Sequence, residues 1–348
     1  MMPKPRLRHA MSLVELLVTI VIVSTLTLTI LPALASVRDK AENEQSRAKL
    51  MQLGQGRDQY ALDNKDRIFS YNWIPGESYT LPDGRTKIGN SWEDAAVNQN
   101  LEILMRRTGR ITGVTKFRSM SGRLPHRRFT HLILIDFLAG DDDSVFNDDQ
   151  LAIDPADQNR LVWSEHPLQY DSVSGLPYAQ GVSNGYDTDP NWSQSGILQR
   201  WAFSTSYDIV PASWQADGPD GYQPVSDTPH LFAGGGNADL SGRSTTEVAF
   251  PSQKVHMHED FDREQNRYPW FAYDHARVEK LMFDGSLNNL SSGEANDSYS
   301  PADPNNVWRQ RYVPLEHFPL PLGGFNDQTE LNMRYRWTQG GLQGVDYE

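Results

Sequence analysis

The chain has 348 residues, of which 38% are hydrophobic and 22% charged, a composition typical of a folded protein with one large domain or two ordinary ones. Its formal net charge of −13 argues against nucleic acid or anionic lipid as the main partner of the whole surface. The absence of cysteine excludes disulfides, thiol catalysis and Cys-ligated zinc, although a chain of this size can fold on its core alone even when exported.

The first predicted element is an apolar helix over residues 11–31. Its only charged residue is Glu15, and it is long enough to cross a bilayer. The segment before it contains no acid and three basic residues, Lys4, Arg6 and Arg8. Because basic flanks stay in the cytoplasm, we expect the rest of the chain to face the other side of the membrane.

Two ordinary interpretations of this helix leave Glu15 unexplained. One is a secretory signal peptide, since Ala33 and Ala35 fit a small-x-small cleavage site, although the apolar run exceeds the usual ~7–15 residues. The other is a permanent signal anchor. A carboxylate at the centre of a membrane helix costs about 2.5–3.5 kcal/mol, less near an interface, and usually has a partner.

The stretch AMSLVELLVTIVIV resembles the processing signal of type IV prepilins and type II secretion pseudopilins. That signal combines a short basic leader, a small residue before the cleavage site and a glutamate at the fifth mature position. Cleavage between Ala10 and Met11 makes Glu15 the fifth residue and Pro32 the twenty-second, where the family has a proline that kinks or loosens the helix. The family usually has glycine in place of Ala10 and phenylalanine in place of Met11.

The resemblance implies processing and N-methylation of Met11 by a prepilin peptidase, and an assembly role for Glu15. In a filament, Glu15 of one subunit meets the new Met11 ammonium of a neighbour. Because pairing offsets much of the cost of burying each charge, this contact sets register more than it adds stability. The implied partners are the peptidase, other pilin or pseudopilin subunits, the inner-membrane assembly platform and membrane lipid, with no nucleic acid.

The implied location is the bacterial inner membrane, crossed once with the N-terminus in the cytoplasm and the head in the periplasm or outside, followed by the filament. We divide the chain accordingly into a leader (1–10), a transmembrane and stalk helix (11–66) and a globular head (67–348).

Residues 37–62 predict the second half of the stalk, because they lack proline and are rich in good helix formers. Gly54 and Gly56 indicate a kink or an early end. One face has helical spacing and is predicted to pack under the head; it comprises Leu50, Leu53, Arg57 and Ala61.

The head shows short apolar runs separated by turn residues. Residues 92–107 predict a helix with an acidic first turn and a basic last turn, which suits the helix dipole. Residues 129–138 are apolar and ambiguous between helix and strand. Residues 200–210 and 254–261 predict strands.

Two later segments complete the predicted fold. Asp284 and Gly285 lie between two apolar runs and predict a hairpin, because both tolerate a positive φ. Residues 331–337 alternate between apolar and polar, which predicts a half-buried strand with one polar face. The expected class is α+β: a long, partly transmembrane N-terminal helix packed on an antiparallel sheet with long loops.

Several head segments resemble a group of prepilin-type proteins common in planctomycete-like bacteria: YALDNKDRIF, LAIDPADQ, STSYDIVP and DHARVEKLMFDGSLNNL. That group ends with a histidine, a spacer and Asp-Gly, which assigns His275, Asp284 and Gly285 to its motif. The spacer here has eight residues where the group usually has nine, and Asp154 stands where it often has cysteine. The hairpin alone also explains the Asp-Gly pair, with His275 in a structural role.

Candidate metal ligands occur in two places. Asp187, Asp189 and Asn191 have the spacing of calcium ligands, but the sixth position of that loop is Trp192 and not glycine, so it is not an EF-hand. His256 and His258 alternate on one predicted strand face before Glu259, and this arrangement fits zinc binding or solvent-facing strand residues.

Charge is segregated along the head. Residues 103–135 carry eight basic residues and no acid, whereas 136–171 carry ten acids and one arginine. Contacts between subunits explain this segregation better than phosphate binding, given the acidic balance of the chain.

The resemblance implies a structural filament subunit, and no phosphate loop, dinucleotide fingerprint or catalytic serine motif appears that would indicate an enzyme. The alternative is a membrane-anchored or secreted protein that binds calcium or glycan outside any filament. A hydrolase acting through His256, His258 and Glu259 is a more distant alternative. No cofactor is expected other than calcium.

Overall fold

The structure is a computed structural model, and the residues it describes are 13–109, 130–140, 150–157, 160–161, 164, 204–215, 217–219, 221–224, 232–234, 239–240, 242–263, 269–311 and 329–348.

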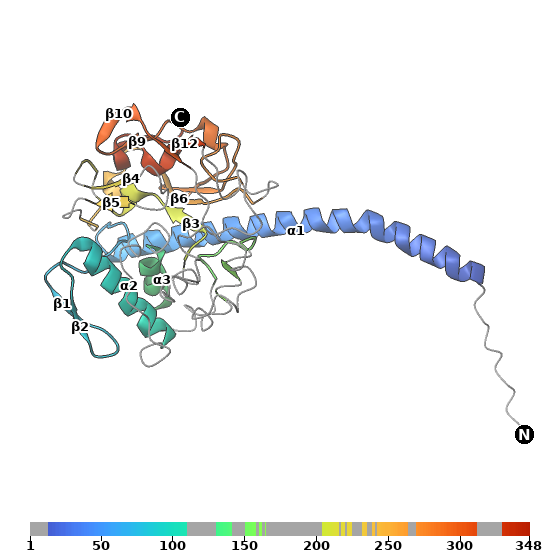
Figure 1. The fold of residues 1–348 in the computed structure, drawn as a ribbon, viewed down its shortest axis with the longest axis horizontal. Coiled ribbons are helices and arrows are strands. Elements are labelled where there is room, and N and C mark those ends of the chain that lie inside the picture. Colours follow the sequence, from blue (N-terminus) through green and yellow to red (C-terminus); the bar gives the residue numbers. More distant parts are fainter. Residues whose placement is uncertain are drawn as a thin grey trace, which may run out of the picture.

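Helix α1 runs from Leu13 to Asp63 without a break. Its N-terminal half projects out of the globular body, and its C-terminal half lies between the helices and the strands of the head (Figure 1). The predicted buried face is confirmed, because Leu50 and Leu53 are fully buried and Arg57 and Ala61 nearly so.

The two glycines of the stalk allow close contact with the head. A methyl group at Gly54 would lie 3.1 Å from Leu281, and one at Gly56 would lie 2.8 Å from Leu138. Both distances are short for a Cβ, so an added methyl group would require the Leu281 or Leu138 side chain to shift. The helix does not end here, because the stalk continues to Asp63.

Two further helices cover one side of α1: α2, Trp92–Thr108, and α3, His131–Ala139. Helix α2 begins where the Ser91 side chain accepts a hydrogen bond from the Asp94 backbone, and Gly109 ends it with φ of 65°. Arg107 Nε donates to Asp136 Oδ1 over 2.7 Å and joins the two helices. The ambiguous segment 129–138 is therefore helical.

The other side of α1 faces an antiparallel sheet whose strand order is β3-β6-β7-β8. Strand β6 pairs with β3 through His258 and Asp208, and with β7 through Met257 and Leu281. The sheet packs directly on the stalk, since α1 contacts both β7 and α3. Its strands are β3 (Tyr207–Ile209), β6 (Val255–Glu259), β7 (Lys280–Met282) and β8 (Leu287–Asn288).

Paired short strands and single 3-10 turns surround this sheet in the described ranges. The antiparallel pairs are β1 (Ser78–Thr80) with β2 (Thr86–Ile88), β4 (Tyr222–Pro224) with β5 (Phe232–Gly234), β9 (Tyr299–Ser300) with β10 (Asp303–Val307), and β11 (Arg309–Arg311) with β12 (Glu330–Asn332). The 3-10 turns are η4 (Pro211–Ser213), η5 (Thr245–Glu247), η6 (Ser292–Glu294), η8 (Arg334–Trp337) and η9 (Gly341–Gln343).

Two strand predictions are corrected by the structure. The alternating segment 331–337 forms strand only as far as Asn332, because Arg334 adopts φ of 48° and starts the turn η8. Its supposed polar face is not exposed, since Arg336 is 1% exposed. Of the segment 200–210, residues 207–209 are strand and 204–206 are buried coil.

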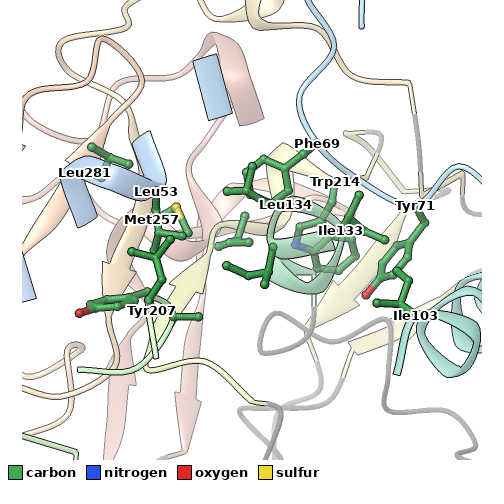
Figure 2. Close-up of a cluster of buried hydrophobic side chains, with 14 of the residues drawn as sticks. Leu53, Phe69, Tyr71, Ile103, Ile133, Leu134, Tyr207, Trp214, Met257 and Leu281 are labelled. Carbon is green, nitrogen blue, oxygen red and sulfur yellow. The ribbon is translucent and has the colours of Figure 1, made fainter. Parts of the chain in front are cut away.

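The main core joins all three layers. Leu53 of α1, Leu134 of α3 and Met257 of β6 belong to one cluster with Leu281 of β7 and Phe69 (Figure 2). The described residues therefore form the expected α+β fold, with the second half of the long helix as part of the hydrophobic core.

Candidate functional site

The N-terminal half of α1 is an uncovered apolar surface. An 18-residue window of this helix is long and apolar enough to cross a membrane, as a span or as a signal sequence, and none of it is buried against the head. Leaving one large apolar side chain in water forgoes about 1.5–3 kcal/mol, so this surface requires lipid or protein around it. The exposed side chains include Leu13, Leu17, Ile20, Ile22, Leu26, Ile30, Leu34 and Val37.

The threonines of this half-helix satisfy their own polar groups. Thr19 Oγ1 donates to the carbonyl oxygen of Glu15 over 2.8 Å, and Thr25 Oγ1 donates to that of Val21 over 2.7 Å. Thr27 repeats the pattern. Because these hydroxyls need no water, they are compatible with an apolar surrounding.

Glu15 lies in the first turn of α1, exposed, where the positive end of the helix dipole favours a carboxylate. The predicted processing residues Ala10 and Met11 lie outside the described residues. At Pro32 the helix continues, although proline has no N–H to donate.

The structure explains Asp284 and Gly285 by the turn between β7 and β8. Asp284 Oδ1 accepts hydrogen bonds from the Ser286 backbone and hydroxyl, and Gly285 has φ of 86°. His275 is exposed, with its ring 5.8 Å from that of Tyr273. The predicted hairpin is confirmed, and it accounts for the Asp-Gly pair without a ligand.

Two head segments that are distant in sequence come together at Asp157. Ser206 donates its backbone N–H to Ala152 over 3.0 Å and its hydroxyl to Asp157 over 2.8 Å. Arg263 donates to Asp157 over 2.7 Å and to Asp154 over 3.0 Å. Asp154 is thus one side of a buried ion-pair network at the edge of the sheet.

His256 and His258 are fully buried in β6, which corrects the expectation of solvent-facing side chains. The His256 ring lies against Phe69 and Phe283, and in the described part of the chain neither of its nitrogens has a hydrogen-bond partner. Burial lowers the pKa of His256 well below its usual value, so its imidazole stays neutral. The His258 ring lies instead against Phe271, so the two histidines face different aromatic groups.

A cleft of about 40 Å³ lies where α1 leaves the head, and no sequence pattern indicated it. Its stalk wall is one helix face with spacing i, i+3, i+4 and i+7, formed by Asp39, Glu42, Asn43 and Ser46. Its head wall includes Glu259 at the end of β6 and Glu279 just before β7. We call this space the stalk–head cleft.

Glu259 connects the stalk to the sheet. The Ser46 hydroxyl donates to Glu259 Oε1 over 2.5 Å, and the Glu279 backbone N–H donates to Oε2 over 3.1 Å. The Ser46 hydroxyl also lies 2.9 Å from that of Tyr207. Burial, followed by the charge of Asp154, raises the pKa of Glu259 to about 8, so this carboxyl group is mostly protonated at neutral pH.

Glu279 is less completely satisfied. Its Oε1 accepts a hydrogen bond from Asn289, but its Oε2 is buried without a hydrogen-bond partner among the described residues, and the side chain is only 3% exposed. Arg47 of α1 stays 4.0 Å from Oε1, the limit of an ion pair. Burial raises the pKa of Glu279.

The calcium candidates Asp187, Asp189 and Asn191 lie outside the described residues. Within the described ranges, no group of three or more histidine, aspartate or glutamate side chains could hold a metal ion. Of the charge-segregated segments, Arg106 and Arg107 at the end of α2 both pair with Asp136 of the same chain, at 3.0 and 2.7 Å.

Comparisons of the chain with protein family models, with curated proteins and with solved structures found no match.

Proposed function

We propose that this chain is a structural subunit of a type IV pilus-like or type II secretion pseudopilus filament, processed by a prepilin peptidase and assembled through the first half of α1. The observation that carries the proposal is the division of one continuous helix into two environments. Leu50, Leu53 and Ala61 are buried in the core of the head, whereas the large apolar side chains from Leu13 to Val37 are exposed.

A continuous rod of this kind supports an assembly helix more than a removable signal. The helix passes through residues 33–36 without interruption, so the apolar half and the stalk form a single element. At 1.5 Å per residue, α1 is about 76 Å long, and about half of that length is available to lipid or to neighbouring subunits. Glu15, in the first turn, then stands where a neighbour's processed N-terminus arrives.

The deciding experiment is mass spectrometry of the N-terminus of the mature protein. A chain that starts at N-methyl-Met11 is expected, because a prepilin peptidase cleaves before the apolar helix and leaves it in place. A chain that starts at Ser36 would overturn the proposal and make the protein a secreted one.

Electron microscopy of Glu15→Ala separates a filament subunit from a lone anchor. We expect this variant to be inserted and processed but not incorporated, because the neighbour's ammonium loses its partner. Glu44→Ala is the matched control, since Glu44 is an exposed acid on the same helix. Normal filaments from Glu15→Ala would contradict the assembly role.

A further inference from the structure

The stalk–head cleft is lined by more carboxyl groups than cationic side chains, although Glu42 pairs with Arg38 and Asp154 with Arg263. Six carboxyl groups line it, and two arginines oppose them. Arg263 is already engaged by two aspartates, and Arg277 is exposed. The six are Asp39, Glu42, Asp154, Glu259, Asp262 and Glu279.

One atom in this lining indicates a missing partner. Glu279 Oε2 is buried and accepts no hydrogen bond from the residues that the structure describes, and a buried acceptor left unsatisfied costs about 1–3 kcal/mol, more when it is charged. A volume of about 40 Å³ accommodates about three water-sized groups. An ammonium group is of that size and offers three donors, which suits a lining in which carboxyl groups predominate.

We propose that the stalk–head cleft binds the Lys40 ammonium of a second copy of this chain. The inference rests on the proposed function in one respect, because it takes the apolar half of α1 as the part that packs against other copies. Under that condition, the cleft begins two residues after Val37, the last exposed large apolar residue in the first half of α1, and lies beside the neighbouring helices.

Lys40 is an exposed cation of the stalk in this region. Arg38 donates to Glu42 of its own helix over 2.6 Å, and Lys49 donates to two backbone carbonyls of the head. Lys40 is exposed, and among the described residues the structure shows no ion-pair partner for it. Since it projects from α1 itself, a parallel neighbour presents it at nearly the level of the cleft.

The predicted Glu15–Met11 contact and the proposed Lys40 contact are compatible with one axial shift between two neighbouring helices. If Glu15 of one copy meets the N-terminus of Met11 in the next, the second helix is shifted by four residues, or about 6 Å along the axis. The same shift brings Lys40 of the second copy level with residue 44 of the first. This level falls within the stretch from Asp39 to Ser46 that forms the stalk wall of the cleft.

Binding of the cation is linked to protonation. Burial keeps a proton on Glu259 at neutral pH, and an ammonium group placed nearby favours release of that proton. Association of two copies is therefore expected to strengthen from pH 6 to pH 8. A contact between surface charges that do not titrate in this range would not show this dependence.

Zero-length carbodiimide cross-linking of the full chain in membranes tests the proposal, because this reagent joins an amine to a carboxyl group that it touches. Equal amounts of unlabelled and ¹⁵N-labelled chain are mixed before association. We expect cross-linked peptides of mixed isotope that join Lys40 to Asp39 or Glu42. Cross-links confined to one isotope, or none at Lys40, would overturn the proposal.

Charge-removing variants provide the matched comparison. Lys40→Gln and Glu279→Gln are each expected to weaken association of the full chain in detergent micelles at least several-fold at pH 8, and Lys65→Gln and Glu44→Gln are the controls. Lys65 lies beyond the other end of α1, and Glu44 is an exposed acid outside the cleft lining. Equal association of Lys40→Gln and Lys65→Gln contradicts the proposal.

The outcomes separate this inference from the proposed function. Filaments that assemble without the Lys40 cross-link leave the function standing and remove the docking site. A Lys40 cross-link between copies that form no filament removes the function and leaves the docking site. Absence of any association removes the docking site, while the mature N-terminus decides the function independently.

Discussion

Replacing Glu259 by glutamine removes a buried proton-binding group with little change of shape. The glutamine oxygen can accept from the Glu279 N–H while its NH₂ group faces the Ser46 hydroxyl, in place of the two hydrogen bonds of Glu259. The pKa of Glu259 rises from its usual 4.5 to about 8 in the folded protein. The folded state therefore holds a proton between these pH values that the unfolded state has lost.

The sign and size of the effect follow from this difference in proton binding. Stabilisation by the protonated carboxyl group is complete below pH 4.5 and is lost as the pH rises through 8. One bound proton changes the free energy of unfolding by about 1.4 kcal/mol per pH unit. Between pH 6 and pH 8, where protonation falls to one half, the wild-type chain should lose about 2 kcal/mol through this group.

The assay is urea denaturation of the full chain in detergent micelles at pH 6 and pH 8, followed by tryptophan fluorescence. The free energy of unfolding of Glu259→Gln should fall by about 2 kcal/mol less than that of the wild type over this range. Asp284→Asn, in the exposed turn between β7 and β8, is the control and should behave as the wild type. The same pH dependence in wild type and Glu259→Gln would refute the assigned protonation of Glu259.

Three further substitutions probe the head. His256→Leu should raise the free energy of unfolding by about 1 kcal/mol, because it removes two buried nitrogens without hydrogen-bond partners among the described residues. The wild-type chain should also lose stability below pH 6.5, because its imidazole binds a proton when unfolded but not when buried, and His256→Leu should reduce this loss. Gly56→Ala should lower stability by about 1–3 kcal/mol despite its better helix propensity, because its methyl group would meet Leu138; an unchanged melting temperature would contradict this close contact. Arg336→Met should cost about 3–5 kcal/mol in urea denaturation, because it leaves the buried carboxylates of Asp208 and Asp260 without their shared cation.

The elements that the sequence predicted well are those with a local cause. Helix α1 follows from its long stretches of helix-forming and apolar residues, α2 from its charged ends, and the β7–β8 hairpin from the tight turn that Asp284 and Gly285 favour. Each depends on residues only a few positions apart, so propensity and spacing are sufficient.

The predictions from sequence are wrong where residues that are distant in the chain determine the local structure. Residues 331–337 alternate like a strand, but Arg336 turns inward because Asp208 and Asp260, more than 70 positions earlier, supply its partners. The cleft has the same origin. Ser46 and Glu259 are 213 positions apart, and nothing in the segments that contain them predicts that they would meet.

The position of the cleft along α1 determines how much an ion pair formed in the cleft contributes to binding. An ion pair on a fully wetted surface contributes only about 0–1 kcal/mol, whereas one at the centre of a bilayer must overcome a large desolvation cost. Residues 39–46 lie between these extremes, because the continuous exposed apolar surface of the first half of α1 ends at Val37 and the buried hydrophobic core begins with Leu50. A lysine that enters there leaves water only at its tip, while the protein walls lower the effective dielectric around the pair. A contact of this kind selects one axial position of a neighbouring helix. A purely apolar helix surface cannot select one position, because it packs almost equally well after a slip of one turn.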